Sequence, residues 1–139
     1  MSKNSLTSTP IGVLLIAGFY IFGAISLLVI RIINPGQAAA FIAERHGLPA
    51  TTGNWILLVV VGIALLIAYG LVSRSRWGFF FTIAYQLYFA AVNLYLSDAM
   101  WATVSCGNAI WSFLVIGYLI LVRRQFLTAG KVSGAQLQQ

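Results

Sequence analysis

Amide and hydroxyl side chains interrupt two long apolar runs of this sequence, at spacings that place them on common helix faces. Gln86 and Asn93 are seven residues apart in the first of these runs, and Asn108 and Ser112 are four apart in the second. An unpaired amide in lipid is costly, so such groups usually bond across helices. Counting from the short segment between the runs places Asn93 level with Asn108, and Gln86 level with Ser112. We therefore expect interhelical hydrogen bonds, which either hold two helices together or line a polar track for a solute.

Tyrosine side chains give the first of these runs a second distinctive face. Tyr85, Tyr88 and Tyr95 recur at helical spacing, on a face that differs from that of Gln86 and Asn93. Such a face suits a lipophilic ligand such as a quinone, a pigment or a lipid. It equally suits a contact with another membrane protein or with the bilayer itself. The sequence leaves these possibilities open.

Ionisable side chains are rare near the apolar runs. Asp98 is the carboxylate closest to one of them, and it falls at the edge of the run. We expect it to cap the following helix or to pair with Arg31 or Arg45. A proton-coupled carrier typically holds an aspartate or glutamate within the membrane, and none is found inside these runs.

The residue sets that catalysis requires are missing from the sequence. His46 is the single histidine and Cys106 the single cysteine, so an internal disulfide and a cysteine or histidine metal site are excluded. There is no glycine-rich phosphate loop, no catalytic Ser/His/Asp set and no acid pair. The sequence therefore predicts a protein that is not an enzyme and that holds no cofactor or metal.

The composition indicates that the solvent around this chain is lipid. Of its 139 residues, 60% are hydrophobic and 7% are charged, whereas soluble domains carry about a quarter charged residues. The net charge of +6 could suggest nucleic acid, but the basic residues stand beside apolar runs and form no patch. The expected partner is a lipid bilayer rather than a nucleic acid.

The apolar runs predict an all-α bundle of four transmembrane helices. The spans are residues 11–33, 55–73, 77–97 and 102–122, within a transmembrane domain of residues 11–124. The first run exceeds the apolar part of a signal peptide, which argues against cleavage. Asn34 and Pro35 are typical of a helix start, so residues 35–46 are predicted to form a short amphipathic helix along the membrane interface. An ordered loop is the alternative for this segment.

Basic residues are distributed unevenly about the four spans. An even number of spans places both termini on one side, with six of the eight Lys and Arg residues: Lys3, Arg74, Arg76, Arg123, Arg124 and Lys131. The other side has Arg31 and Arg45. The positive-inside rule then predicts that segments 1–10 and 125–139 are cytoplasmic, in the bacterial inner membrane or an equivalent membrane.

Three short motifs give the chain a resemblance to known proteins. Pro10-x-Gly12-Val13 opens the first run, and Tyr69-Gly70-Leu71 precedes Arg76-Trp77-Gly78. With these motifs the chain resembles the small four-helix membrane proteins of unknown function that are common in bacteria. The resemblance implies a four-helix architecture and no particular activity. The four-helix multidrug exporters differ, because they rely on a glutamate in the first span and residues 11–30 contain none.

Two hypotheses for function follow from these patterns. The first is a non-catalytic accessory or structural subunit that packs against other membrane subunits, or against copies of itself, with the tyrosine face as the first candidate contact. The alternative is a small carrier or binder of a lipophilic molecule, with its site between the third and fourth spans. Replacing Gln86 and Asn93 with leucine should abolish binding in the second case.

Overall fold

The computed structural model describes residues 9–96 and 102–135, and in these residues the chain is all-α, as predicted. The helices are α1 (Ile11–Ile33), α2 (Pro35–Arg45), α3 (Gly53–Val72), α4 (Arg76–Tyr95) and α5 (Ala102–Ala135), with a 3-10 turn η1 at Ala50–Thr52. Three helices of the described residues are long and apolar enough to cross a membrane, over Ile11–Ile33, Trp55–Val72 and Ser105–Leu127. The protein is therefore a membrane-spanning protein by the length and composition of its helices.

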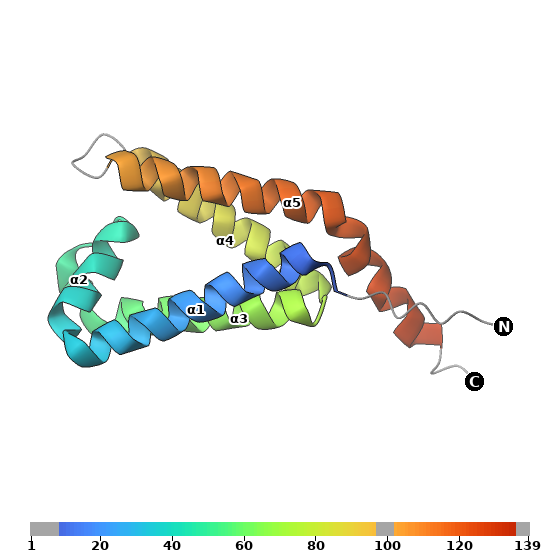
Figure 1. The fold of residues 1–139 in the computed structure, drawn as a ribbon, viewed down its shortest axis with the longest axis horizontal. Helices are drawn as coiled ribbons and strands as arrows, with labels where there is room; N and C mark the ends of the chain where they lie inside the picture. Colours follow the sequence, from blue (N-terminus) through green and yellow to red (C-terminus); the bar gives the residue numbers. More distant parts are fainter. Residues whose placement is uncertain (1–8, 97–101, 136–139) are drawn as a thin grey trace.

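The helices form two antiparallel pairs. Helix α1 packs along α3, and α4 packs along α5, while direct contact between α1 and α5 is slight. The start of α1, the turn between α3 and α4 and the end of α5 lie toward one end of the molecule, and α2 lies at the other end (Figure 1). The fold thus has one end built from helix termini and a tight turn, and an opposite end covered in part by α2.

The turn between α3 and α4 is held by close backbone contact. Ser75 caps α4 because its Oγ accepts a hydrogen bond from the Gly78 amide at 3.1 Å, and the same hydroxyl donates to the Gly70 carbonyl at 3.1 Å. Arg74 has a φ of 51°, which reverses the chain. A Cβ on Gly70 would lie 2.6 Å from the Gly78 Cα, so the two helices meet here without room for a methyl group.

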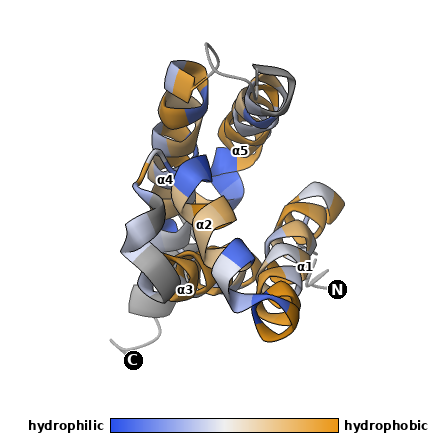
Figure 2. Cartoon of the chain, turned by 90° about the vertical axis from the view of Figure 1, so that its left-hand side faces the viewer, coloured by the Kyte–Doolittle hydropathy of each residue, from blue (hydrophilic) through white to orange (hydrophobic). Residues whose placement is uncertain are grey.

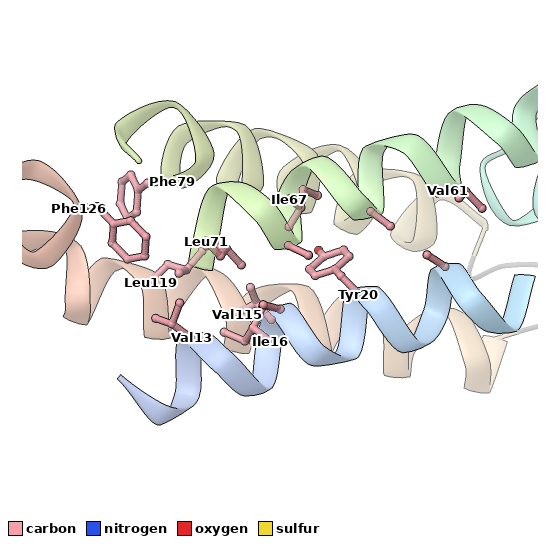
Figure 3. Packing of buried hydrophobic residues seen from close by; sticks show 14 of the residues in the cluster. Val13, Ile16, Tyr20, Val61, Ile67, Leu71, Phe79, Val115, Leu119 and Phe126 are labelled. Atoms are coloured by element: carbon pink, nitrogen blue, oxygen red, sulfur yellow. The ribbon is translucent and has the colours of Figure 1, made fainter. Parts of the chain in front are cut away.

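The apolar core extends along α1 and α3 from this turn to Ala38 of α2, and it includes residues of α4 and α5. Val13, Leu71, Val115 and Leu119 are buried and point toward one another from α1, α3 and α5 (Figure 3). Phe126 is fully buried against Phe79, with the ring centroids 5.4 Å apart. This core joins both helix pairs and fixes how they sit against each other.

Helix α2 has the start that its sequence predicts. The Asn34 side chain accepts a hydrogen bond from the Gln37 amide, and Pro35 occupies the first turn. The helix ends at Arg45, with His46 as its C-cap. Its small residues Ala38, Ala39 and Ala43 are buried, and α2 packs on α1 and α3. Figure 2 shows hydrophilic residues on α2, beside helices that are mainly hydrophobic.

Helix α5 continues beyond residue 122, where the fourth span was predicted to end, and reaches Ala135. The physical reason lies in tertiary contacts of its later turns. Phe126 is buried against α4, and Arg76 donates a hydrogen bond from Nη2 to the Leu127 carbonyl at 2.9 Å. These contacts explain why the helix continues past residue 124, where the sequence analysis placed the end of the transmembrane domain.

Candidate functional site

A cavity of about 320 Å³ opens between α1, α4 and α5, beside the last residue of α2. Its walls carry aromatic rings, two amides and one guanidinium: Phe19, Tyr20, Arg45, Tyr85, Gln86, Phe89, Asn108 and Trp111. The cavity lies where α1 and α5 diverge, and Tyr20 joins it to the apolar core. Rings at several points and few polar groups are the usual composition of a small-molecule site.

Gln86 lies at the wall of this cavity, and only one end of its side-chain amide makes a hydrogen bond. Its Nε2 donates to the Tyr20 hydroxyl at 2.6 Å, and the side chain is 1% exposed. Its Oε1 is buried and has no hydrogen-bond partner. The predicted bond with Ser112 is not made, since Ser112 Oγ donates to the Asn108 carbonyl at 3.0 Å within α5. Gln86 therefore joins α4 to α1 and leaves one acceptor unused.

The structure brings Asn93 and Asn108 together, as expected from counting residues from the segment that connects the two helices. Asn108 Nδ2 donates to Asn93 Oδ1 at 2.9 Å, and Asn93 Nδ2 donates to the Phe89 carbonyl at 2.7 Å. Arg45 Nη2 donates to Asn108 Oδ1 at 2.6 Å. The result is a chain of hydrogen bonds that runs from the end of α2, through α5, to the backbone of α4. Arg45 and Asn108 of this chain line the cavity.

Arg45 brings a positive charge to the cavity wall. Its guanidinium lies 5.5 Å from the ring centroid of Phe89 and 5.9 Å from that of Phe41. Burial lowers the pKa of this guanidinium from its ordinary value, because the charged form loses hydration, although the Tyr85 hydroxyl acts in the opposite direction. Its Nε is buried and has no partner. Arginine remains charged in proteins, so the wall carries a cation with an unused donor.

Tyr85 also lines the cavity, next to Gln86, although the sequence had assigned the two to separate faces. The His46 Nδ1 lies 2.9 Å from the Ile42 carbonyl and must donate to it, which leaves Nε2 to accept from the Tyr85 hydroxyl at 3.4 Å. The pKa of His46 is lowered chiefly by burial and further by Arg45, against the raising effect of its bond to Ile42. His46 is thus a neutral imidazole that is hydrogen-bonded to Ile42 of α2 and to Tyr85 of α4.

The other predicted site residues lie apart from the cavity or outside the described residues. Tyr88 donates to the His46 carbonyl at 3.4 Å, and Tyr95 is 84% exposed at the end of α4. Arg31 lies in the last turn of α1 and does not line the cavity. Asp98 falls outside the described residues, so its role as a cap or as a partner of Arg31 or Arg45 stays a prediction.

Sequence reasoning missed three cavity residues that come from α1 and α5. Tyr20 supplies the hydroxyl that Gln86 needs, and Phe19 packs on Trp111 with centroids 4.7 Å apart. A tyrosine in the middle of an uncharged span was a usable signal, because a buried phenol requires a hydrogen-bond partner. Nothing in the sequence indicated that the partner would be Gln86.

The walls of the cavity present hydrogen-bonding groups and aromatic rings. Comparison of the chain with protein-family models, with curated proteins and with solved structures gives no match. Arguments about function therefore rest on the geometry of the cavity and on the arrangement of the helices.

Proposed function

We propose that the chain is a four-span integral membrane protein of the plasma membrane, with cytoplasmic termini, that binds a small amphipathic molecule between α1, α4 and α5. The binding hypothesis drawn from the sequence placed such a site between the third and fourth spans. The cavity adds α1 as a third wall. Residues 35–45 are proposed to lie along the outer interface, with the turn at Arg74 on the cytoplasmic side.

The proposal that α4 crosses the membrane is supported by the orientation of its side chains. The helix has 20 residues, which at about 1.5 Å each match a hydrocarbon thickness of about 30 Å. Its polar residues Thr82, Gln86 and Asn93 are buried, whereas Phe80 and Leu94 are more than half exposed. Polar groups turned inward and apolar groups turned outward are the arrangement expected in lipid. These buried polar groups lower the mean hydropathy of α4, but they do not face the lipid and so do not oppose its crossing of the membrane.

The connection to α3 supports the same conclusion. Only residues 73–75 separate α3 from α4, and the two helices touch at Gly70 and Gly78. If α3 crosses the bilayer, α4 must return from the same side. It then runs antiparallel to α5, the third apolar helix. These observations support four crossings, and the distribution of the basic residues favours cytoplasmic termini.

The observation that carries the binding function is a pair of buried, unpartnered polar atoms at one cavity. Gln86 Oε1 lacks a donor and Arg45 Nε lacks an acceptor, and both residues line the same space. A buried polar group that is left unpaired costs about 1–3 kcal/mol, and more when it is charged. Neither atom has accessible surface, so a ligand would recover that free energy once the Gln86 and Arg45 side chains turn toward it.

The test is native mass spectrometry of the protein after extraction in a mild detergent. We expect a small molecule bound in a one-to-one ratio, and we expect its occupancy to fall in Gln86→Leu. Thr82→Val is the matched control, because Thr82 is a buried polar residue of the same helix that bonds only to the Gly78 carbonyl of its own helix. A wild-type chain that carries no bound molecule would exclude the binding function, and a Gln86→Leu chain that retains the molecule at the wild-type occupancy would exclude the contact with Gln86.

An accessory role in a larger complex, which is the first hypothesis from the sequence, is our second proposal. Tyr95 is 84% exposed at the end of α4, and it is the tyrosine with the largest surface left for a partner subunit. Proteins that co-purify with the wild-type chain and are lost on Tyr95→Ala would support this role. The absence of any stoichiometric protein partner in mild detergent would exclude it.

A further inference from the structure

We propose that the cavity selects an anionic single-chain lipid, whose carboxylate or phosphate is held by Arg45 and whose hydroxyl donates to Gln86. This inference rests on the proposed function, since it names the ligand of the same cavity. It adds charge selectivity and an orientation, neither of which follows from the presence of a cavity.

The charge of the ligand follows from the charge of the wall. Arg45 is the one ionic residue among the described residues that line the cavity, and the groups around it are neutral amides, phenols and rings. No carboxylate is found among the described residues that line the cavity, and the Asn108 amide supplies a dipole but no charge. Among these residues the half-buried Arg45 has no counter-charge, and a neutral lipophile would not supply one. An oxyanion compensates the charge of Arg45 and also accepts from the unused Nε.

The second polar contact fixes the orientation of the ligand. Gln86 lies nearly two helical turns from Asn93 on α4, farther from α2 than the bonded chain of Arg45, Asn108 and Asn93. Its Oε1 accepts hydrogen bonds, so the group that meets it must be a donor. A head group with the anion toward α2 and a hydroxyl toward the middle of the bundle satisfies both residues.

The size and the walls of the cavity indicate where the apolar part goes. At about 320 Å³ the cavity is at the small end of ligand sites, which suits a head group and the first part of a chain. Phe19 both lines the cavity and is 53% exposed, and its ring packs on Trp111 across the gap between α1 and α5. An acyl chain leaving past this ring pair would enter the surrounding lipid.

Binding of matched lipids to the purified full chain tests the inference. The probes are oleoyl-lysophosphatidate, which has the anion and the hydroxyl, and monooleoylglycerol, which lacks the phosphate. Free glycerol phosphate lacks the chain. Binding is followed by the fluorescence of Trp111 in a chain with Trp55→Phe, Trp77→Phe and Trp101→Phe, so that the signal comes from the cavity wall.

We expect oleoyl-lysophosphatidate to bind about 10- to 100-fold more tightly than monooleoylglycerol, which is the range of one charge-assisted hydrogen bond. Arg45→Gln should abolish this ratio, and Arg45→Lys should retain part of it. Gln86→Leu should weaken both lipids by a similar factor, because both carry the hydroxyl. Millimolar glycerol phosphate should not displace the lipid. Circular dichroism of each variant verifies that the helices persist.

The outcomes separate this inference from the function on which it rests. Saturable binding of both lipids with a ratio near one would overturn the charge selectivity and leave a lipophile site. The same holds if the ratio persists in Arg45→Gln. Displacement by glycerol phosphate would show that the free oxyanion is the ligand and would overturn the lipid assignment. If neither lipid binds, the binding function fails together with the inference.

Discussion

Replacement of Gly70 by alanine should separate α3 from α4 and destabilise the fold. A Cβ at this position would lie 2.6 Å from the Gly78 Cα and 3.1 Å from Cη2 of Trp77. Carbon atoms normally approach to about 3.5–4.0 Å, so the methyl group would overlap a backbone atom by about 1 Å. The Gly78 backbone cannot rotate away as a side chain could. The helices must therefore move apart.

The size of the effect follows from two opposing contributions. Overpacking of a tight contact costs about 1–3 kcal/mol. Alanine in place of glycine within a helix gains up to about 1 kcal/mol. Gly62→Ala in the same helix is the matched control, because a Cβ there would meet nothing within 4 Å and only the gain applies. The two variants should therefore differ by about 1–3 kcal/mol in the free energy of unfolding.

The assay is denaturant unfolding of the purified protein in detergent, followed by circular dichroism. The Gly70→Ala, Gly78→Ala double variant adds a further test, since helices that are already separated should tolerate the second methyl group at little extra cost. Equal stability of Gly70→Ala and Gly62→Ala would show that α3 and α4 do not touch at these glycines, and the reasoning on the turn would be refuted.

Three further predictions concern single polar residues. Ser75→Ala should lower the free energy of unfolding by about 1 kcal/mol, because it removes the cap of α4. Ser73→Ala is the milder control, since it loses only a 3.3 Å bond to the Gly70 carbonyl, and equal losses in chemical denaturation would contradict the prediction. Asn108→Leu should cost about 1–3 kcal/mol by leaving the side chain of Arg45 without its acceptor, and an unchanged denaturation midpoint would exclude that role. Burial lowers the pKa of His46 below its usual 6.5, so the folded state favours the neutral imidazole. The stability of the protein should therefore be full above about pH 6.5 and fall as the pH drops toward the lower pKa of the folded state. Melting curves of His46→Asn should not show this loss.

Helix boundaries near strong local signals could be predicted from the sequence, because the signals act within a few residues. The uncharged run from Ile11 and the Asn34-Pro35 start gave the bounds of α1 and the start of α2. The end of α5 could not be predicted in this way. It depends on the burial of Phe126 against Phe79, which joins residues far apart in the chain.

The contacts of the candidate site also differ in whether they depend on nearby or on distant parts of the chain. Asn93 and Asn108 belong to neighbouring helices with a short connection, so counting residues was enough to set their relative depth. Gln86 bonds to Tyr20 of α1, and Arg45 reaches Asn108 only because α2 folds back over the end of the bundle. Both contacts depend on how the helix pairs rotate against each other, which periodicity along one helix does not specify.

The number of crossings and their direction underlie every proposal above, and cysteine accessibility in intact cells tests them most directly. In a Cys106→Ser background, Glu44→Cys on α2, Ser73→Cys in the α3–α4 turn and Tyr95→Cys at the end of α4 each lie at an exposed position. With a membrane-impermeant maleimide, we expect Glu44→Cys and Tyr95→Cys to react in intact cells and Ser73→Cys to react only after the membrane is opened. Reaction of Ser73→Cys from the same side as either of the other two would contradict the four-span arrangement.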